Sequence, residues 1–527
     1  LKGVLYINSR QWAIQNVIAE PVDKTMIDMT FEQNYRWVEA GQHWFPDQLN
    51  FEVLMPRYPH KFMGMQVVGK TYVKEPQINP PLEKKAFNNL VYTLGEDAFN
   101  KSDSVWAIHR VEPLKLRELK TYERLDSIGK KINLDRKLDL LTALSTGKYP
   151  LGKFDLDLRH LYRTNEYEKN RFGLGFSTNQ KLSPHFSASA YGAYGLGDKA
   201  WKYGGQLQLH LWKTPQIDFV IDYHDDLREP AIVDLPDLSS DLVQRRFYAS
   251  QMDQQELLAF RLKAPLFKYA QLSLNVQRER LSPTYDYQFQ LPDLPALSDF
   301  QFSSVGLQLR YSYGEQFIPL LGSRVPAGNN PHPVFQLTYE RGIEGFWGGQ
   351  FDYDKWQFGA EHQFRIRGLG ETSFRIEAGW INNTLPYSKL FAGSGLGRGF
   401  QLFAIDNNFQ TMDLYEFVSD RFAHLFFTHN FGAFLYHEKY SRPEISVVQN
   451  IGYGQLNDRT PHQLIDFKTM EQGYFESGLV VDNLIRIPYV NFAYIGLGLG
   501  VYYRYGSYAF PERADNFAYR LSIDLTL

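Results

Sequence analysis

The chain has 527 residues, 16% of them aromatic, with a formal net charge of −3 at pH 7 and no cysteine. A chain of this length is too long for one small hydrophobic core, so we expect two or more regions. The weak net charge offers no basic surface for a nucleic-acid partner. The lack of cysteine excludes disulfides and thiolate metal sites. No uninterrupted apolar run reaches the length of about 18 residues that a spanning helix requires, which excludes helical membrane proteins.

Residues 1–100 are predicted to form a β-rich region. Short apolar stretches are separated by polar or proline-containing turns, as expected for antiparallel strands. The predicted strands are 4–7, 13–18, 26–31 and 51–55. A proline-rich linker follows at 74–81.

Residues 101–150 are predicted to form a helical linker or a segment at the mouth of the next region. Between 112 and 146, apolar residues such as Leu116 and Leu119 recur at roughly helical spacing among charged neighbours. Gly147 and Pro150 then end the pattern.

From residue 151 to 527 the apolar period changes to two. Phe172, Leu174 and Phe176 alternate with small residues, and the same alternation runs through Trp201–Leu211 and the final Phe517–Leu527. Successive side chains of a strand point to opposite faces, so each segment has one apolar and one polar face. About sixteen such segments, at transmembrane length, are typical of an outer-membrane β-barrel with lipid outside and a polar lumen. A soluble sandwich or propeller is the alternative, but no blade-length repeat is present.

The fold class predicted is therefore all-β: a transmembrane antiparallel β-barrel of about 16 strands, with a small N-terminal β/α region. Long acidic segments at 225–245 and 281–299 are expected to be extracellular, because external loops of bacterial barrels are long and periplasmic turns are short. We expect the N-terminal region to lie in the periplasm. A barrel needs an export signal, and Leu1–Tyr6 already has a strand pattern, so we expect a processed chain with an upstream region.

The segment Phe391–Phe400 differs from the strands around it. It contains four glycines, and its one charged residue is Arg398. Glycine permits a tight fold-back with the backbone close to a wall, and an arginine on such a loop is placed to form a bidentate pair with a lumenal carboxylate.

This segment resembles the sixth extracellular loop of the BamA/TamA-type outer-membrane assembly superfamily. The matching tripeptide is Arg398-Gly399-Phe400, which follows the eleventh predicted strand. The resemblance implies that the loop folds into the lumen, that Arg398 pairs with an inner carboxylate, with Glu416 or Asp420 as candidates, and that the barrel opens laterally between its first and last strands.

A narrower resemblance rests on four further segments. They are Ser104–Trp106, Tyr194–Gly204, Tyr415–Phe422 and Tyr474–Gly478. These are similar to a Bacteroidota outer-membrane barrel family whose members carry a carboxypeptidase-regulatory-like domain ahead of the barrel. The resemblance implies that this domain is the upstream region expected above.

Motifs for catalysis or metal binding are not found. His224-Asp225-Asp226 is interpreted as part of an acidic external loop rather than as metal ligands, and neither His-Glu-x-x-His nor Gly-x-Ser-x-Gly occurs. Inward charges, among them Arg375 and Glu377, are interpreted as a ladder that fills the interior, with a substrate path as the alternative. We therefore expect no enzyme, no catalytic residue, no metal and no cofactor.

Three functions remain open. The first is assembly or translocation of outer-membrane proteins or surface lipoproteins through an exposed strand edge. The second is a structural accessory barrel in a larger envelope complex, and the third is a barrel lipase. The expected partners are outer-membrane lipid and lipopolysaccharide and other envelope proteins, without nucleic acid.

Overall fold

The fold was analysed in a computed structural model. The structure describes residues 2–9, 12–22, 28–38, 43–55, 65–77, 80–81, 102–114, 116, 120, 121, 124, 127, 131, 147–213, 216–235, 249–292, 295–320, 323–326, 330–397, 402–433, 436, 438, 440–490 and 493–526.

The N-terminal part is an antiparallel sheet in the order β1-β2-β3-β4-β5. Its strands are β1 (Lys2–Ile7), β2 (Ile14–Glu20), β3 (Asp28–Val38), β4 (His43–Met55) and β5 (Met65–Tyr72). The first four overlap the predicted strands, while β5 was not predicted. The helix predicted at 112–146 lies mostly outside the described residues; α1 (Asp103–His109) precedes it. Among the described helices, none is long and apolar enough to cross a membrane.

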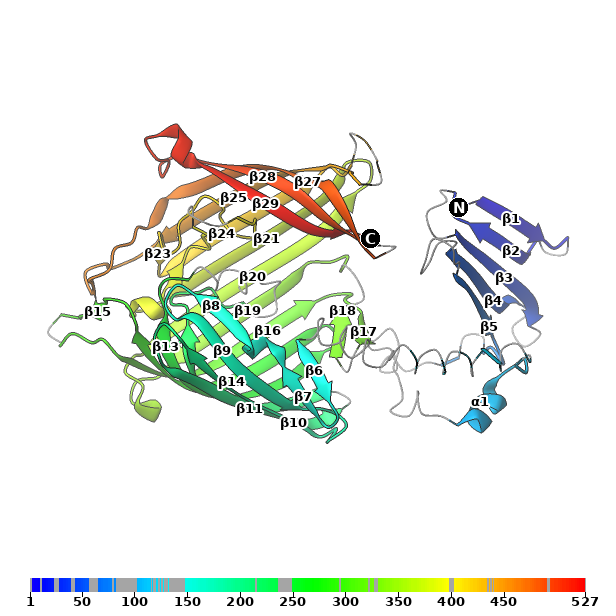
Figure 1. Ribbon diagram of the computed structural model, residues 1–527, viewed down its shortest axis with the longest axis horizontal. Helices are drawn as coiled ribbons and strands as arrows, with labels where there is room; N and C mark the ends of the chain where they lie inside the picture. The colour runs from blue at the N-terminus through cyan, green and yellow to red at the C-terminus, as the bar shows by residue number, and fades with distance from the viewer. Residues whose placement is uncertain are drawn as a thin grey trace.

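The larger part is a closed antiparallel β-barrel, which confirms the predicted fold class (Figure 1). Its strands are β6 (Lys148–Leu151), β7 (Phe154–Asp157), β8 (Tyr162–Asn165), β9 (Lys169–Thr178), β10 (Phe186–Gly195), β11 (Trp201–Lys213), β12 (Gln216–Arg228), β13 (Asp253–Phe267), β14 (Ala270–Pro283), β16 (Phe300–Ser312), β19 (Val334–Gly342), β20 (Tyr353–Ile366), β21 (Gly370–Ile381), β24 (Arg421–Asn430), β25 (Glu444–Gln455), β27 (Met470–Val490), β28 (Ala493–Tyr505) and β29 (Phe517–Thr526).

The number of barrel strands agrees with the number of about sixteen predicted from the sequence. β7 and β8 pair with the two halves of β9, so together they form one interrupted strand, and β6 is only a four-residue hairpin arm. Counted this way over the described residues, the barrel has sixteen strands besides β6. The alternation places side chains as expected: in β29, Tyr519 is 70% exposed on the outside whereas Arg520 is 3% exposed inside.

Short elements lie in the connections. They are β15 (Gln288–Phe289), β17 (Phe317–Leu320), β18 (Ser323–Pro326), β22 (Phe391–Ala392), β23 (Val418–Ser419), β26 (His462–Gln463) and the 3₁₀ turns η2 (Leu158–His160), η3 (Phe346–Gly348), η4 (Tyr387–Lys389) and η5 (Arg513–Asn516).

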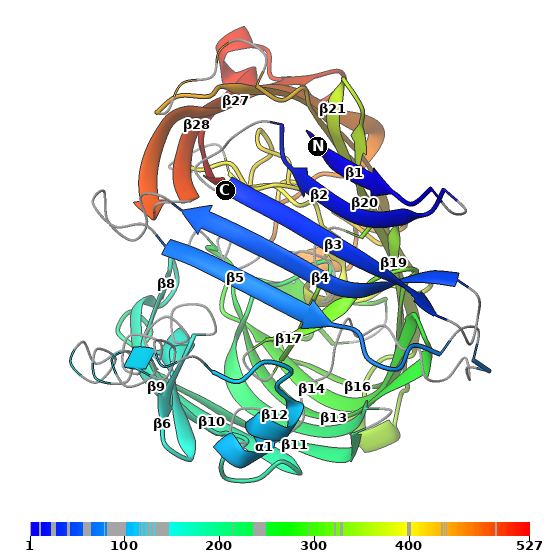
Figure 2. The same cartoon turned by 90° about the vertical axis from the view of Figure 1, so that its right-hand side faces the viewer.

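The two barrel ends differ. At one end the connections 214–215, 268–269 and 367–369 are short, although 313–333 and 431–443 at the same end are longer; at the opposite end, long connections include 284–299 and 382–420. β29 ends on the short-turn side. The β1–β5 sheet lies beyond this end, in front of the barrel mouth (Figure 2).

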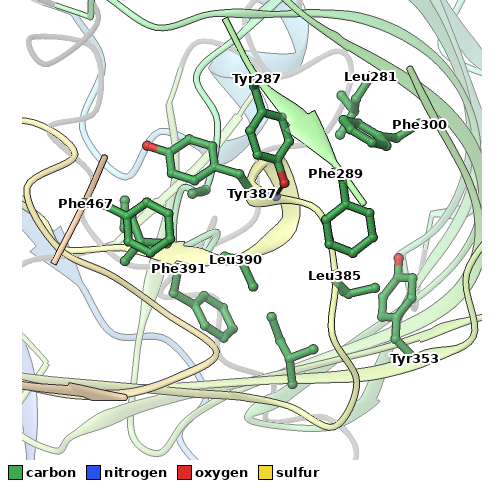
Figure 3. Close-up of a cluster of buried hydrophobic side chains, with 14 of the residues drawn as sticks. Leu281, Tyr287, Phe289, Phe300, Tyr353, Leu385, Tyr387, Leu390, Phe391 and Phe467 are labelled. Carbon is green, nitrogen blue, oxygen red and sulfur yellow. Dashed lines mark hydrogen bonds between the residues drawn. The ribbon is translucent and has the colours of Figure 1, made fainter. Parts of the chain in front are cut away.

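At the long-loop end the interior is filled by aromatic side chains (Figure 3). Tyr287, Phe289 and Tyr387 come from the loops, and they pack on inward side chains of the wall such as Phe300 and Tyr353. The prediction of a polar lumen is therefore wrong at this end. The physical reason is that inward-folded loops, rather than water, face these strand positions.

Hydrogen bonds join three long loops in this aromatic cluster. The Tyr287 hydroxyl lies 2.9 Å from His462 Nδ1 and accepts the Tyr387 backbone N–H at 2.9 Å. Burial among aromatic rings lowers the pKa of His462 to about 4. The neutral imidazole can then accept the Tyr287 proton at Nδ1.

Candidate functional site: the lumenal loop and the edge of the last strand

The connection between β21 and β24, residues 382–420, folds back on itself inside the barrel; we refer to it as the lumenal loop. β22 pairs with β23, and Gly397 N donates to Met412 O at 2.9 Å. Gly395 has no space for a side chain, because an added Cβ would lie 2.6 Å from the carbonyl oxygen of Asp413. The glycines thus allow the two arms of the loop to touch, as the sequence suggested.

The second arm of the lumenal loop is buried against the barrel wall. Phe409, Met412 and Phe417 form a compact apolar cluster with Met470 and Tyr474 of β27, and all five side chains are almost fully buried. This packing fixes the loop to the wall beside the last strands rather than leaving it in the lumenal solvent.

The predicted motif Arg398-Gly399-Phe400 lies outside the described residues. Its candidate partners are described. Glu416 binds Arg504 of β28, whose two Nη atoms donate to the two carboxylate oxygens at 2.9 and 3.0 Å. Asp420 accepts the backbone N–H of Asn457 at 2.8 Å and lies 3.2 Å from Arg421 Nε.

Arg504 is a wall residue that sequence reasoning missed. Its side chain is 1% exposed, and its guanidinium lies over the rings of Phe510 and Tyr474 at 4.3 and 4.8 Å. Planar stacking and a bidentate carboxylate are the surroundings that suit arginine rather than lysine. The sequence signal that could have found Arg504 is its charge at an inward position of β28, where the strand register places it directly opposite Glu476 of β27.

Two further wall charges hold the backbone of the lumenal loop. Glu476 of β27 is fully buried and accepts the N–H groups of Gln410 and Thr411 at 3.0 and 2.6 Å. Arg520 of β29 donates to the carbonyl oxygens of Gly397 and Gln410, the first at 2.8 Å. Both arms of the loop are therefore attached to the last three strands.

The first arm is attached on the opposite wall by Lys389 in η4. Its ammonium lies 2.6 Å from Glu279 Oε2 of β14 and 3.3 Å from Glu340 Oε1 of β19. Arg228 also binds Glu279, at 2.9 Å, and Lys355 donates to the Lys389 carbonyl at 2.8 Å. A buried ammonium with two carboxylates resists withdrawal, because removing it leaves uncompensated buried charge.

Other charges singled out in the sequence belong to the wall. Arg375 and Glu377 pair at 2.7 Å inside the barrel, in agreement with an interior charge ladder. His224, Asp225 and Asp226 were predicted to lie in an external loop, and this is wrong: β12 continues to Arg228. Asp226 points inward and binds Arg171 of β9, because the alternation extends further than the acidic composition suggested.

The edge of the last strand is the second part of the site. β29 is partnered with β28 along its whole length, from Phe517 to Thr526. The strand order closes with β6 beside β29, but the two strands differ in length, since β6 has four residues and β29 has ten. On this edge Leu521 N donates to Leu402 O at 2.7 Å, and Ala404 N donates to Leu521 O at 2.8 Å.

These features define the class of protein: a transmembrane β-barrel whose lumen is occupied by its own loop and whose last strand has an edge partly covered by that loop. The chain belongs to the family of unknown function DUF5686, whose C-terminal domain matches residues 161–440.

Solved structures with a similar barrel share little sequence with the chain. BamA from Haemophilus ducreyi lacking POTRA domains 1–3 is 10% identical, with a TM-score of 0.41, over 69% of this chain and 68% of that one. CdiB from Escherichia coli is 12% identical, with a TM-score of 0.37, over 68% and 59%. OccK11 from Pseudomonas aeruginosa is 12% identical, with a TM-score of 0.27, over 68% and 89%. Comparison with curated protein sequences gives no match.

Proposed function

We propose that this barrel assists the assembly or translocation of outer-membrane proteins or surface lipoproteins at the outer edge of β29, without catalysis. The supporting observation is a mismatch of strand lengths at the seam. β29 has ten residues, whereas β6, the strand next to it in the barrel order, has four. β6 is too short to pair with β29 along its length.

An incompletely paired edge has a cost in a membrane. Each backbone N–H or C=O without a partner in the hydrocarbon region costs several kcal/mol. Such an edge therefore favours pairing with an incoming strand, in the mode known as β-augmentation. The client is then an outer-membrane strand or an extended lipoprotein segment, in contact with outer-membrane lipid and lipopolysaccharide.

The filled lumen supports this role over passage of a solute. The lumenal loop occupies the interior between Lys389 on one wall and the last three strands on the other. The proposal places the long loops outside the cell and the β1–β5 sheet in the periplasm. There the sheet, and the upstream carboxypeptidase-regulatory-like domain that the resemblance implies, would meet other envelope proteins.

The alternative is a structural accessory barrel of a larger outer-membrane complex. The observation that favours it is the rigid interior, in which the aromatic cluster and the charge pairs of the lumenal loop tie several strands together. A purely structural barrel needs no free edge. The two roles therefore differ in whether β29 is contacted by clients.

Position-specific photocrosslinking in living cells separates them. Ile523 of β29 and Leu499 of β28 both point outward, with side chains 59% and 53% exposed, but β28 is paired on both edges. A photoreactive residue at Ile523 should capture outer-membrane barrel proteins or lipoproteins, identified by mass spectrometry. The same residue at Leu499 should capture lipid alone. Equal capture at both positions, or no protein at Ile523, would contradict the proposal.

A further inference from the structure

The edge of β29 is not open along its whole length. Leu521 exchanges two backbone hydrogen bonds with Leu402 and Ala404, and Phe403 is its parallel bridge partner. The N–H and C=O of Leu521 point away from β28, so these bonds occupy the groups that an added strand would use. The segment Leu402–Ala404 therefore acts as a short substitute strand, which we name the strap.

The strap is held in place from both sides. Arg520, the residue before Leu521, donates to the carbonyl oxygens of Gly397 and Gln410, which flank the strap in the chain. Glu476 then fixes Gln410 from the neighbouring strand β27. These are buried, charge-assisted hydrogen bonds, and such bonds are stronger than those between neutral groups.

From this arrangement we infer that the strap is an autoinhibitory contact, which blocks the middle of the β29 edge until it is displaced. The inference rests on the proposed function, since it assumes that clients pair with this edge. Leu521 lies midway along β29. A client strand in continuous register must use its N–H and C=O, so it cannot pair over the whole edge while the strap is bound. The strap thus separates a resting state from a client-accepting state.

A disulfide across this contact tests the inference directly. The chain has no cysteine, so Phe403→Cys with Leu521→Cys introduces one defined pair. Bridge partners on adjacent strands lie within disulfide reach. The probe is a fluorescent synthetic peptide with the sequence Phe517–Thr526, and its binding to the full chain in lipid nanodiscs is measured by anisotropy. The matched control, Leu499→Cys with Leu521→Cys, links β29 to its regular partner β28.

We expect the oxidised strap variant to bind the peptide at least tenfold more weakly than the reduced variant, with no such change in the control. Equal binding in both redox states would overturn the strap and leave edge pairing in place. No binding in either state would overturn both the strap and the proposed function. Failure of the disulfide to form in folded barrels would overturn the contact itself.

A second variant tests the strap without a cross-link. Ala404→Pro removes the N–H that binds the Leu521 carbonyl, whereas Ala404→Ser keeps it. The proline variant should bind the peptide more tightly than the wild type, and the serine variant should match the wild type. Retained heat modifiability on electrophoresis shows that both barrels are folded. Proline binding equal to that of serine would contradict autoinhibition.

Discussion

At the residue scale, the lumenal loop is held by charges that come mainly from the wall. The sequence suggested an arginine on the loop and a carboxylate opposite it. The described residues show a different pair, with Glu416 on the loop and Arg504 on β28. The predicted pair of Arg398 stays a prediction, because Arg398 lies outside the described residues. The Glu416–Arg504 pair joins residues 88 positions apart in the chain, a contact that the sequence pattern alone does not reveal.

Removing Arg504 should destabilise the barrel more than removing any exposed partner of Glu416. Arg504→Ala removes the buried, bidentate partner of Glu416 and leaves only the exposed Lys468, so the loss should approach the cost of about 3–5 kcal/mol for breaking a buried ion pair. Lys468 also contacts Glu416 but is 58% exposed, so Lys468→Ala should cost less than about 1 kcal/mol. Urea unfolding in detergent micelles gives both values. Similar losses for the two variants would show that the buried pair is not structural.

Acidic pH should loosen the loop cluster around His462. Its folded pKa of about 4 lies below the value of about 6.5 for an unfolded chain. The stabilisation is therefore complete above pH 6.5 and is lost as the pH falls towards 4, by about 3 kcal/mol in total. Hydrogen exchange in residues 284–292 should accelerate between pH 7 and pH 4.5, after correction for the intrinsic pH dependence of exchange.

Two substitutions test whether His462 causes this pH effect: one replaces His462 itself, and the control replaces a second, exposed histidine. His462→Gln keeps a hydrogen-bond acceptor but cannot titrate, so it should abolish the pH dependence. His185 lies in an exposed turn, and His185→Gln should leave it unchanged. A pH dependence that persists in His462→Gln would assign the effect to another group.

At the element scale, strand alternation carried most of the fold prediction. The period of two in Phe517–Leu527 predicted β29 correctly, because lipid outside and close packing inside act on every second residue. β5 and the short β6 were missed, since neither has a long alternating pattern. The site was less predictable: Glu476, Arg504 and Arg520 resemble any inward polar residue until the lumenal loop is placed against them.

The alternation of β29 gives a direct mutational test. Ile523 is on the outer face, two residues beyond the middle of β29, and Ile523→Arg should cost up to about 2–4 kcal/mol, the value for the membrane midplane. The next residue, Asp524, lies on the opposite face, so Asp524→Arg should be tolerated. The fraction of heat-modifiable, folded barrel in outer-membrane preparations measures the difference. Equal folding yields would contradict the register of this strand.

At the scale of the whole molecule, the barrel is a plugged structure whose loop is attached to opposite walls. The wild-type protein should therefore show little conductance in planar lipid bilayers. Lys389→Glu places a third carboxylate beside Glu279 and Glu340, and the repulsion should displace the first arm of the lumenal loop and raise conductance. Lys181→Glu, in an exposed turn, is the charge-matched control. Unchanged conductance in Lys389→Glu would show that this attachment does not close the lumen.

The order of the chain gives these attachments a consequence for biogenesis. The lumenal loop precedes β27, β28 and β29 in the sequence, yet Glu476, Arg504 and Arg520 on those strands hold it. The loop cannot reach its final position until the C-terminal strands have arrived and wrapped around it. Seating of the loop therefore cannot precede the arrival of the C-terminal strands, and the strap can bind the β29 edge only once β29 is in place.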